Sequence, residues 1–169
     1  YVGGSPSNTC VGVRRLGLQS ALITGIGDDY VGDFVLNFLQ NEGVETRFVY
    51  RKENKRTSAV LLGIEPPDKY PLVFYRENCA DNAITIDDIM KTQFNNALIF
   101  QIAGTNLSKN PTKDATLYAI EQAKKHKVEI LLDIDFRPDQ WDDIKAFGVT
   151  IRSILQNIDI VLGTDDEIN

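Results

Sequence analysis

Two short groups of charged side chains in this 169-residue sequence have the spacing of a site for an anionic small molecule. Asp133 and Asp135 are two positions apart, so a strand that ends there would present both carboxylates on one face. Arg137 follows just beyond, and Arg76 follows another predicted strand. An arginine donates two parallel N–H groups to a carboxylate, which a lysine does not do. The alternatives are a structural Asp–Arg pair at the strand end and an ordinary surface charge at Arg76.

Backbone groups supply a second candidate site near the start of the sequence. Gly3 and Gly4 open directly into a predicted helix. Glycines there allow a ligand to approach the backbone closely, and the first N–H groups of a helix favour an oxygen-rich partner. The alternative is an ordinary helix cap formed by Ser7 or Asn8. A dinucleotide-binding loop is not indicated, because no Gly-x-Gly-x-x-Gly follows a strand.

Hydrophobic periodicity indicates which elements carry these residues. The predicted strands cover residues 20–24, 46–50, 57–64, 72–75, 97–100, 128–134 and 158–162, and the predicted helices cover residues 7–16, 30–41, 111–126 and 147–155. The second, third and fourth strands follow one another without helices, which predicts a small antiparallel sheet. The other strands alternate with helices, which predicts a parallel α/β sheet covered on both faces. Ligands of such sheets bind beyond the carboxyl ends of the strands, so the candidate loops are 25–29, 104–105, 133–137 and 163–167.

Composition and charge exclude several classes of protein. The net charge is −6 and the acidic and basic residues are interleaved, so no basic surface for a nucleic acid is indicated. No apolar run is long enough to span a bilayer, so no membrane partner is expected. Cys10 and Cys79 are isolated, which is typical of a reducing, cytoplasmic compartment. Because His126 is the one histidine, neither a zinc site nor a histidine-based hydrolytic triad is expected.

Several short runs together resemble the first signature of the ribokinase / phosphofructokinase-B family of carbohydrate kinases. They are Gly3-Gly4-Ser5-Pro6-Ser7-Asn8, Gly12, Leu16-Gly17 and Gly25-Ile26-Gly27-Asp28-Asp29-Tyr30-Val31-Gly32. The resemblance runs over the whole chain and implies a ribokinase-like, three-layer α/β/α fold with a small antiparallel β lid. It assigns residues 1–44 and 83–169 to the α/β core and residues 45–82 to the lid. The family's first strand and its second half have no counterpart in the sequence, so we expect a fold truncated at both ends.

The resemblance also implies roles for individual residues in binding a sugar. It places Gly3, Gly4 and Asn8 against sugar hydroxyls, and it places Asp28 in the turn that borders the sugar pocket. The remaining substrate-binding residues that it implies are Phe74, Arg76, Asp135 and Arg137. Two arginines in one pocket suit a sugar acid better than a neutral sugar.

Magnesium and catalysis are implied in the same way. Glu167 matches the glutamate of the family's Asn-x-x-Glu element, which organises Mg²⁺ and phosphate through water, although Thr164 stands in place of the asparagine. The alternative for Glu167 is an acidic residue in the first turn of a helix. The family's catalytic aspartate lies in a Gly-Ala-Gly-Asp stretch that the sequence lacks. We therefore expect that aspartate downstream of Asn169, and no catalytic activity from this chain alone.

Within the family, the runs Tyr75–Asp81, Asp133–Pro138 and Gly163–Glu167 are similar to those of kinases that act on keto-deoxy sugar acids. The expected activity of the parent protein is transfer of the ATP γ-phosphate to a hydroxyl of 5-dehydro-2-deoxy-D-gluconate, a reaction of inositol catabolism. Alternatives within the family are 2-keto-3-deoxygluconate and other sugars. Alternatives of other classes are a non-catalytic sugar-binding module and an NAD-dependent oxidoreductase. The apolar run Ala59–Leu62 and the family likeness imply a homodimer formed through the lid.

Overall fold

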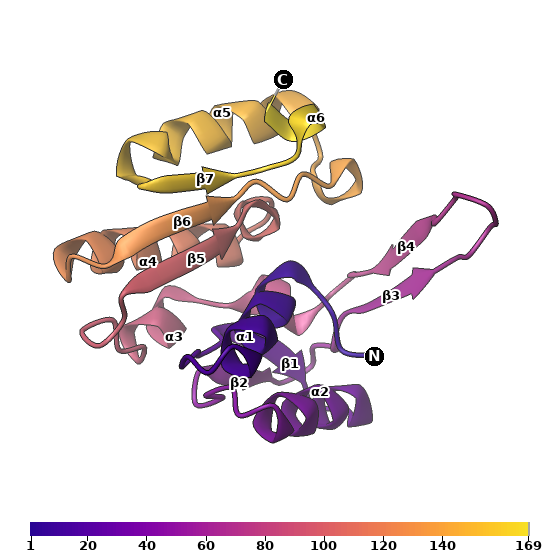
Figure 1. Cartoon of the computed structure of the whole chain (residues 1–169), viewed down its shortest axis with the longest axis horizontal. Coiled ribbons are helices and arrows are strands. Elements are labelled where there is room, and N and C mark those ends of the chain that lie inside the picture. Colours follow the sequence, from indigo (N-terminus) through magenta and orange to yellow (C-terminus); the bar gives the residue numbers. More distant parts are fainter. Residues whose placement is uncertain (169) are drawn as a thin grey trace.

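The computed structural model describes residues 1–168 and shows an α/β protein whose strands form three groups (Figure 1). The strands are β1 (Thr24–Gly27), β2 (Val49–Lys52), β3 (Ala59–Leu62), β4 (Leu72–Tyr75), β5 (Ile99–Ala103), β6 (Glu129–Asp133) and β7 (Ile160–Leu162). A parallel sheet has the order β5-β6-β7, and β1 pairs in parallel with β2. β3 and β4 form an antiparallel hairpin that projects away from the rest of the molecule.

Helices connect the strands and cover the sheet. The α-helices are α1 (Ser5–Arg15), α2 (Tyr30–Asn41), α3 (Ile86–Met90), α4 (Thr112–Lys125), α5 (Ile144–Ile154) and α6 (Asp165–Ile168), and the 3₁₀ turns are η1 (Ala80–Ala83), η2 (Gly104–Leu107), η3 (Pro138–Gln140) and η4 (Leu155–Asn157). The Asp29 carboxylate caps α2 by accepting a hydrogen bond from the backbone N of Gly32 at 2.7 Å. The predicted helix 30–41 is confirmed at both ends. Among residues 1–168, no helix is long and apolar enough to cross a membrane.

The larger hydrophobic core lies between the three-stranded sheet and α4. Its members on β5, β6 and α4 with at most 1% exposure are Ile102, Ile130, Leu132, Ala115, Ala119 and Ala123. The alanines let the helix approach the strands closely, and each buried isoleucine or leucine contributes about 1.5–3 kcal/mol. A smaller core cluster joins α1 to α2 and consists of Val11, Leu22, Leu39 and Val44. These cores fix the strand ends that carry the polar loops.

Two expectations about the first strands are wrong. The predicted strand 20–24 and glycine turn 25–29 are replaced by β1, which continues through Gly27 because it pairs with β2. A Cβ atom at Gly25 would lie 2.1 Å from the backbone oxygen of Ala80, so this glycine serves close packing rather than a turn. The predicted antiparallel sheet of three strands has two, since β2 belongs to the parallel pair. A lid that begins at residue 45 would therefore include one strand of the parallel pair.

For the polar residues, one alternative does not occur and one expectation is wrong. The helix α1 begins at Ser5, with Gly4 in the cap position and no side-chain cap, so capping by Ser7 or Asn8 does not occur. The strand β6 ends at Asp133, and the backbone of Asp135 has a left-handed φ of 40°. The alternation that would present both carboxylates on one strand face therefore stops before Asp135.

Candidate functional site

Residues 133–140 run from the end of β6 towards α5, and we call them the 133–140 segment. They form the centre of a cluster of polar loops. Side chains from the start of α1, the end of β4, the turn after β5 and the start of α6 all contact it. The β5, β6 and β7 parts meet because parallel strands end at the same edge of their sheet. The candidate site therefore lies at the carboxyl edge of the sheet, where the strand-end rule predicts it.

Ser5 connects the glycine pair to this edge. The Ser5 hydroxyl donates a hydrogen bond to the Asp133 carboxylate at the end of β6. Ser5 is the first residue of α1, and Gly4 before it has a φ of 95°, which side chains rarely tolerate. The glycine pair and the end of β6, both predicted as parts of the site, are thus brought together by a side chain that the prediction did not include.

Asp135 occupies a constrained position within the cluster. Its carboxylate accepts a hydrogen bond from the Thr105 hydroxyl at 3.4 Å and pairs with the Arg137 guanidinium at 2.8 Å. Burial raises the pKa of Asp135 above its ordinary value; Arg137 lowers it, and the nearby Asp133 carboxylate raises it further. The backbone is tight here as well, because a Cβ atom at Gly104 would lie 2.0 Å from the backbone oxygen of Ile134. The Asp–Arg pair that was the alternative to a ligand site is therefore present, at the edge where a ligand is predicted.

Glu167 fastens the start of α6 to the 133–140 segment. One carboxylate oxygen accepts from the backbone N of Phe136 at 2.7 Å and the other accepts from the backbone N of Thr164 at 2.8 Å. Burial alone would raise the pKa of Glu167, but these amide donors outweigh it and hold the pKa below its ordinary value. Among residues 1–168, no group of three or more His, Cys, Asp or Glu side chains could hold a metal ion. The arrangement of Glu167 is compatible with Mg²⁺ through water and does not offer a direct ligand set.

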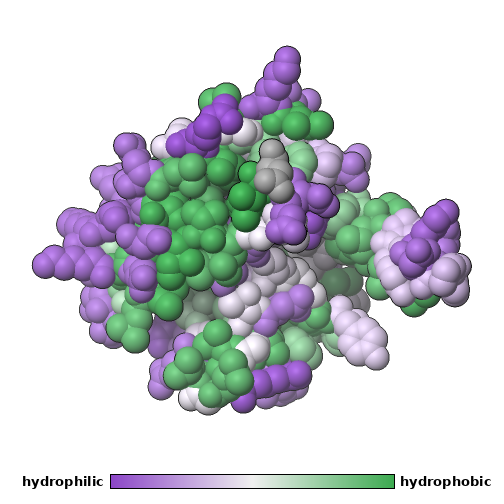
Figure 2. All heavy atoms as spheres, turned by 45° about the horizontal axis from the view of Figure 1, so that its top comes forward, coloured by the Kyte–Doolittle hydropathy of each residue, from purple (hydrophilic) through white to green (hydrophobic). Residues whose placement is uncertain are grey.

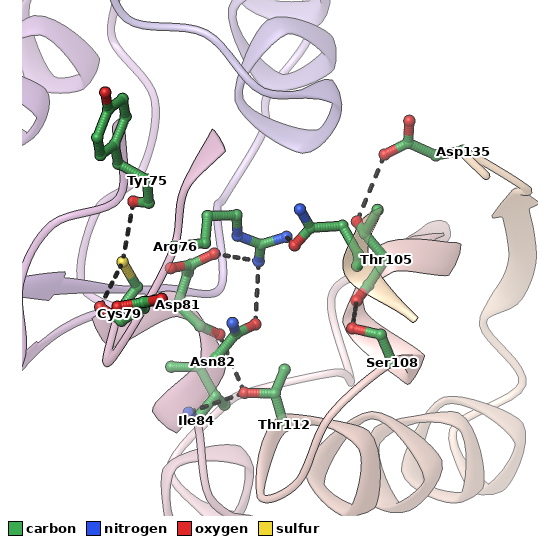
Figure 3. Close-up of polar contacts among 12 residues, drawn as sticks. Tyr75, Arg76, Cys79, Asp81, Asn82, Ile84, Thr105, Ser108, Thr112 and Asp135 are labelled. Atoms are coloured by element: carbon green, nitrogen blue, oxygen red, sulfur yellow. Dashed lines mark hydrogen bonds and ion pairs between the residues drawn. The ribbon is translucent and has the colours of Figure 1, made fainter. Parts of the chain in front are cut away.

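Arg76 lies directly after β4 and is bound by the protein itself (Figure 3). Its Nη1 donates to the side-chain oxygen of Gln140 at 2.8 Å, and its Nη2 donates to Asn82 at 3.0 Å and pairs with Asp81. The Arg76 side chain is 14% exposed, whereas the Arg137 side chain is 44% exposed. Both arginines have protein partners at their terminal nitrogens, since Arg137 Nη1 donates to the backbone oxygen of Phe136 at 3.1 Å and Arg137 Nη2 pairs with Asp135. The two differ in exposure, and Arg137 has the side chain that a ligand can reach more easily.

Three predicted residues have no side-chain hydrogen bond or ion pair to this cluster among the described residues. Asn8 is exposed within α1, and the Asp28 side chain, 82% exposed, lies 3.6 Å from Arg51. Phe74 lies on β4 opposite Val60 and is half-buried. Their roles stay predictions.

A hollow of about 540 Å³ lies beside the cluster. It is lined mainly by α5 and α6 side chains, Arg152 among them, and it shares Phe136 and Glu167 with the site, but neither Arg76 nor Arg137 lines it. The loops therefore converge through side-chain contacts rather than around one enclosed cavity.

Sequence reasoning missed four polar residues of the cluster, which are Ser5, Asp81, Asn82 and Gln140. Ser5 follows the glycine pair directly, so its position was a usable signal. Asp81 and Asn82 lie in η1, a short turn without hydrophobic periodicity. Gln140 is 7% exposed in another such turn, and nothing in the sequence distinguishes it from a surface glutamine.

The protein has the features of an α/β ligand-binding protein. Polar loops lie at the carboxyl edge of its parallel sheet, glycines precede a helix, and a hairpin projects from the body. Within that class, the family model for pfkB family carbohydrate kinases matches residues 1–169, so the chain belongs to this family. The predicted membership of the ribokinase / phosphofructokinase-B family is confirmed.

Individual relatives agree with this membership. A curated relative from Bacillus velezensis, named 5-dehydro-2-deoxygluconokinase, is 33% identical over 168 residues, which are 99% of this chain and 51% of the relative. The crystal structure of an uncharacterized sugar kinase from Pyrococcus horikoshii has a TM-score of 0.90 and 28% identity, and the match covers 98% of this chain and 56% of that one. Its complex with ATP has a TM-score of 0.84 and 27% identity, over 94% and 52%. The ribokinase-like α/β fold is thus confirmed, and the chain spans about half the length of the curated relatives it matches.

Proposed function

We propose that this chain forms part of an ATP-dependent kinase that phosphorylates a hydroxyl of a keto-deoxy sugar acid, with 5-dehydro-2-deoxy-D-gluconate as the first candidate. The observation that carries the proposal is Arg137, whose side chain is 44% exposed at the edge of the loop cluster beside Asp135. A partly exposed guanidinium at the carboxyl edge of the sheet is suited to the carboxylate of a sugar acid. The curated relatives named 5-dehydro-2-deoxygluconokinase support the same choice.

The sugar hydroxyls are assigned to the neighbouring polar groups. We assign hydroxyl contacts to Gly3, Gly4 and Asn8, and the Ser5–Asp133 hydrogen bond supports this by holding the glycine pair against β6. Asp135 would accept from a hydroxyl beside Arg137. Asp28 and Phe74 are assigned to the border of the pocket.

ATP is the proposed phosphate donor, supported by the family and by the ATP complex of the Pyrococcus horikoshii kinase. Mg²⁺ is proposed to accompany it, with Glu167 contributing through water because its oxygens already accept from backbone amides. The aspartate that removes the hydroxyl proton is assigned to the part of the complete protein outside these residues. The 169-residue chain alone is therefore expected to bind ATP negligibly by calorimetry.

A homodimer through the β3–β4 hairpin is the proposed assembly of the complete protein. Apolar side chains lie along the hairpin in Figure 2, and Leu61, Leu62 and Val73 are each more than half exposed. Such a surface loses contact with water when a second hairpin covers it. The free thiols of Cys10 and Cys79 support action in a reducing, cytoplasmic compartment.

The test is a substrate panel on the complete protein and its Arg137→Ala variant. The panel contains 5-dehydro-2-deoxy-D-gluconate, 2-keto-3-deoxygluconate and a neutral hexose. Loss of a charge-assisted contact predicts a fall of about 100-fold in kcat/KM for the acid and a far smaller fall for the neutral sugar. Arg47→Ala is the matched control, because Arg47 is an exposed arginine that pairs with Glu45 away from the cluster.

Other outcomes separate the alternatives. Equal phosphorylation of the acid by the Arg137→Ala variant and the intact protein contradicts the carboxylate assignment. Preference for 2-keto-3-deoxygluconate changes the named substrate and keeps the class. Binding of a sugar without turnover in the presence of ATP and Mg²⁺ favours a non-catalytic sugar-binding module.

A further inference from the structure

The β3–β4 hairpin is attached to the rest of the molecule mainly at its base. All four residues of β3 are exposed, and three of the four residues of β4 are exposed. On the first arm, the Thr57 backbone N and hydroxyl both donate to the Asp29 carboxylate at 2.8 Å. On the second arm, Arg76 binds Gln140, Asp81 and Asn82. The position of the hairpin is therefore set largely by these two anchors.

The second anchor leads to the 133–140 segment. Gln140 accepts from Arg76 through its side chain, and its backbone N donates to the backbone oxygen of Arg137 at 2.9 Å. One residue thus holds the hairpin base with its side chain and the Arg137 backbone with its main chain. Gln140 is 7% exposed, so water does not readily replace the acceptor if it is removed.

The same contacts limit what Arg76 does by itself. One terminal nitrogen is directed to Gln140 and the other to Asp81 and Asn82. Figure 3 labels Asp81 and Asn82 beside Arg76. A substrate carboxylate would have to displace one of these acceptors to form a bidentate pair with Arg76. Arg76 is better placed to join two structural elements than to clamp a ligand alone.

We infer that Gln140 is a positioning residue that couples the hairpin to the 133–140 segment, so that Arg137 is held in its binding position through the chain Arg76–Gln140–Arg137. The inference deepens the proposed sugar-acid kinase activity and rests on it for its kinetic consequence. The coupling itself is a property of the fold and has a readout that does not need activity.

The first measurement is hydrogen–deuterium exchange on the complete protein. Gln140→Ala removes the acceptor, Gln140→Glu keeps an acceptor for Arg76, and Gln140→Asn replaces Gln140→Ala if the latter does not fold. Exchange in residues 59–76 and 137–141 is expected to accelerate about tenfold in Gln140→Ala and to return close to the original rate in Gln140→Glu. Thr116→Val is the matched control, because Thr116 is a buried polar residue whose hydroxyl bonds within α4.

The second measurement is steady-state kinetics with the sugar acid. Gln140→Ala is expected to raise KM about tenfold with kcat changed far less, and Gln140→Glu is expected to restore KM. A double variant with Arg76→Ala should be no worse than Arg76→Ala alone, since both changes break one chain of contacts.

Each result counts for or against the inference. Unchanged exchange in both segments of Gln140→Ala overturns the coupling, whether or not the protein is a kinase. Faster exchange of both segments with an unchanged KM overturns the link to substrate. If the intact protein does not phosphorylate the acid, the proposed function fails, while the exchange experiment still decides whether Gln140 couples the two elements.

Discussion

The 133–140 segment and the β3–β4 hairpin both leave the body of the protein between strands and helices, and they are held in different ways. Along the 133–140 segment, Asp133, Asp135, Phe136 and Gln140 each have a polar partner from another part of the chain. Along the hairpin, the strands pair with each other and expose apolar side chains on β3 and β4. An isolated two-stranded hairpin is marginally stable in water.

This difference assigns different tasks to the two regions. The segment is fixed by polar contacts before any ligand arrives, which is what a site needs to hold charged groups in one geometry. Beyond the two anchors at its base, the hairpin has exposed strands and few contacts that would oppose a movement. Mutations should therefore act through unfolding free energy in the segment and through association or movement in the hairpin.

Gly104→Ala is expected to have the largest effect, because Gly104 packs against the 133–140 segment. The new Cβ atom would lie 2.0 Å from the backbone oxygen of Ile134, and a backbone atom cannot rotate away. Such overpacking should lower the free energy of unfolding by about 3 kcal/mol, measured by urea unfolding of the complete protein. Gly12→Ala in α1 is the control, since nothing lies within 4 Å of its added Cβ and alanine favours a helix. A Gly104→Ala protein as stable as the original would contradict this close approach of β5 and β6.

Asp29→Ala is expected to loosen the first anchor of the hairpin. The carboxylate caps α2 and accepts two hydrogen bonds from Thr57, so its loss should cost about 2 kcal/mol and should accelerate amide exchange near Thr57. Burial alone would raise the pKa of Asp29, but the Thr57 and Gly32 donors hold it below its ordinary value. Because the folded pKa is lowered, this stabilisation is present above the unfolded pKa and is lost as pH falls through the folded pKa.

The control for this prediction is the neighbouring aspartate. Asp28 is 82% exposed in its side chain, so Asp28→Ala should leave the unfolding free energy within about 0.5 kcal/mol. If both variants lose the same stability, or if the Asp29→Ala effect is the same at every pH, the anchor is not the source of the loss.

The regular elements that lead into both regions were predictable from sequence, for a physical reason. Strands and amphipathic helices repeat their apolar residues, so the strand 72–75 of the hairpin and the helix 30–41 were correct at both ends, and the predicted strand 128–134 lies within one residue of β6 at each end. The strand-end rule then placed Asp133–Arg137 and Glu167 at one edge, and the structure joins them there. Family likeness supplied the glycine pair, and the Ser5–Asp133 contact brings it to the same edge.

What the sequence did not reveal depends on partners far away in the chain. Whether residues 49–52 pair in parallel or antiparallel is decided by the strand beside them, and local pattern does not name that strand. The partners of Arg76 are Asp81 and Asn82 nearby and Gln140 at 64 positions' distance. An arginine that binds a ligand and an arginine that binds the protein look alike until those neighbours are known.

Asp135→Asn, in the 133–140 segment, is expected to raise the free energy of unfolding slightly and to impair function. Burial raises the pKa of Asp135, so its ionised form costs stability; this cost is absent below the unfolded pKa and grows as pH rises through the folded pKa. Asparagine also tolerates the left-handed φ of 40°. We expect a gain of about 1 kcal/mol at neutral pH that disappears in acid, with lower kcat/KM for the sugar. Asp139→Asn, an exposed change in the same loop, should show neither effect; a loss of stability at neutral pH in Asp135→Asn would reverse the assignment.

Leu61→Ser is expected to have the smallest effect on the protomer and to show what the hairpin does. Leu61 is 59% exposed, so its replacement should change the unfolding free energy of a protomer by less than about 0.5 kcal/mol. If hairpins pair in the complete protein, the same change removes apolar area from the interface. The sedimentation coefficient should then fall from the value of a dimer towards that of a monomer. Leu98→Ser is the matched control, because Leu98 is 87% exposed before β5 and far from the hairpin in sequence. A dimer that survives Leu61→Ser unchanged places the interface elsewhere.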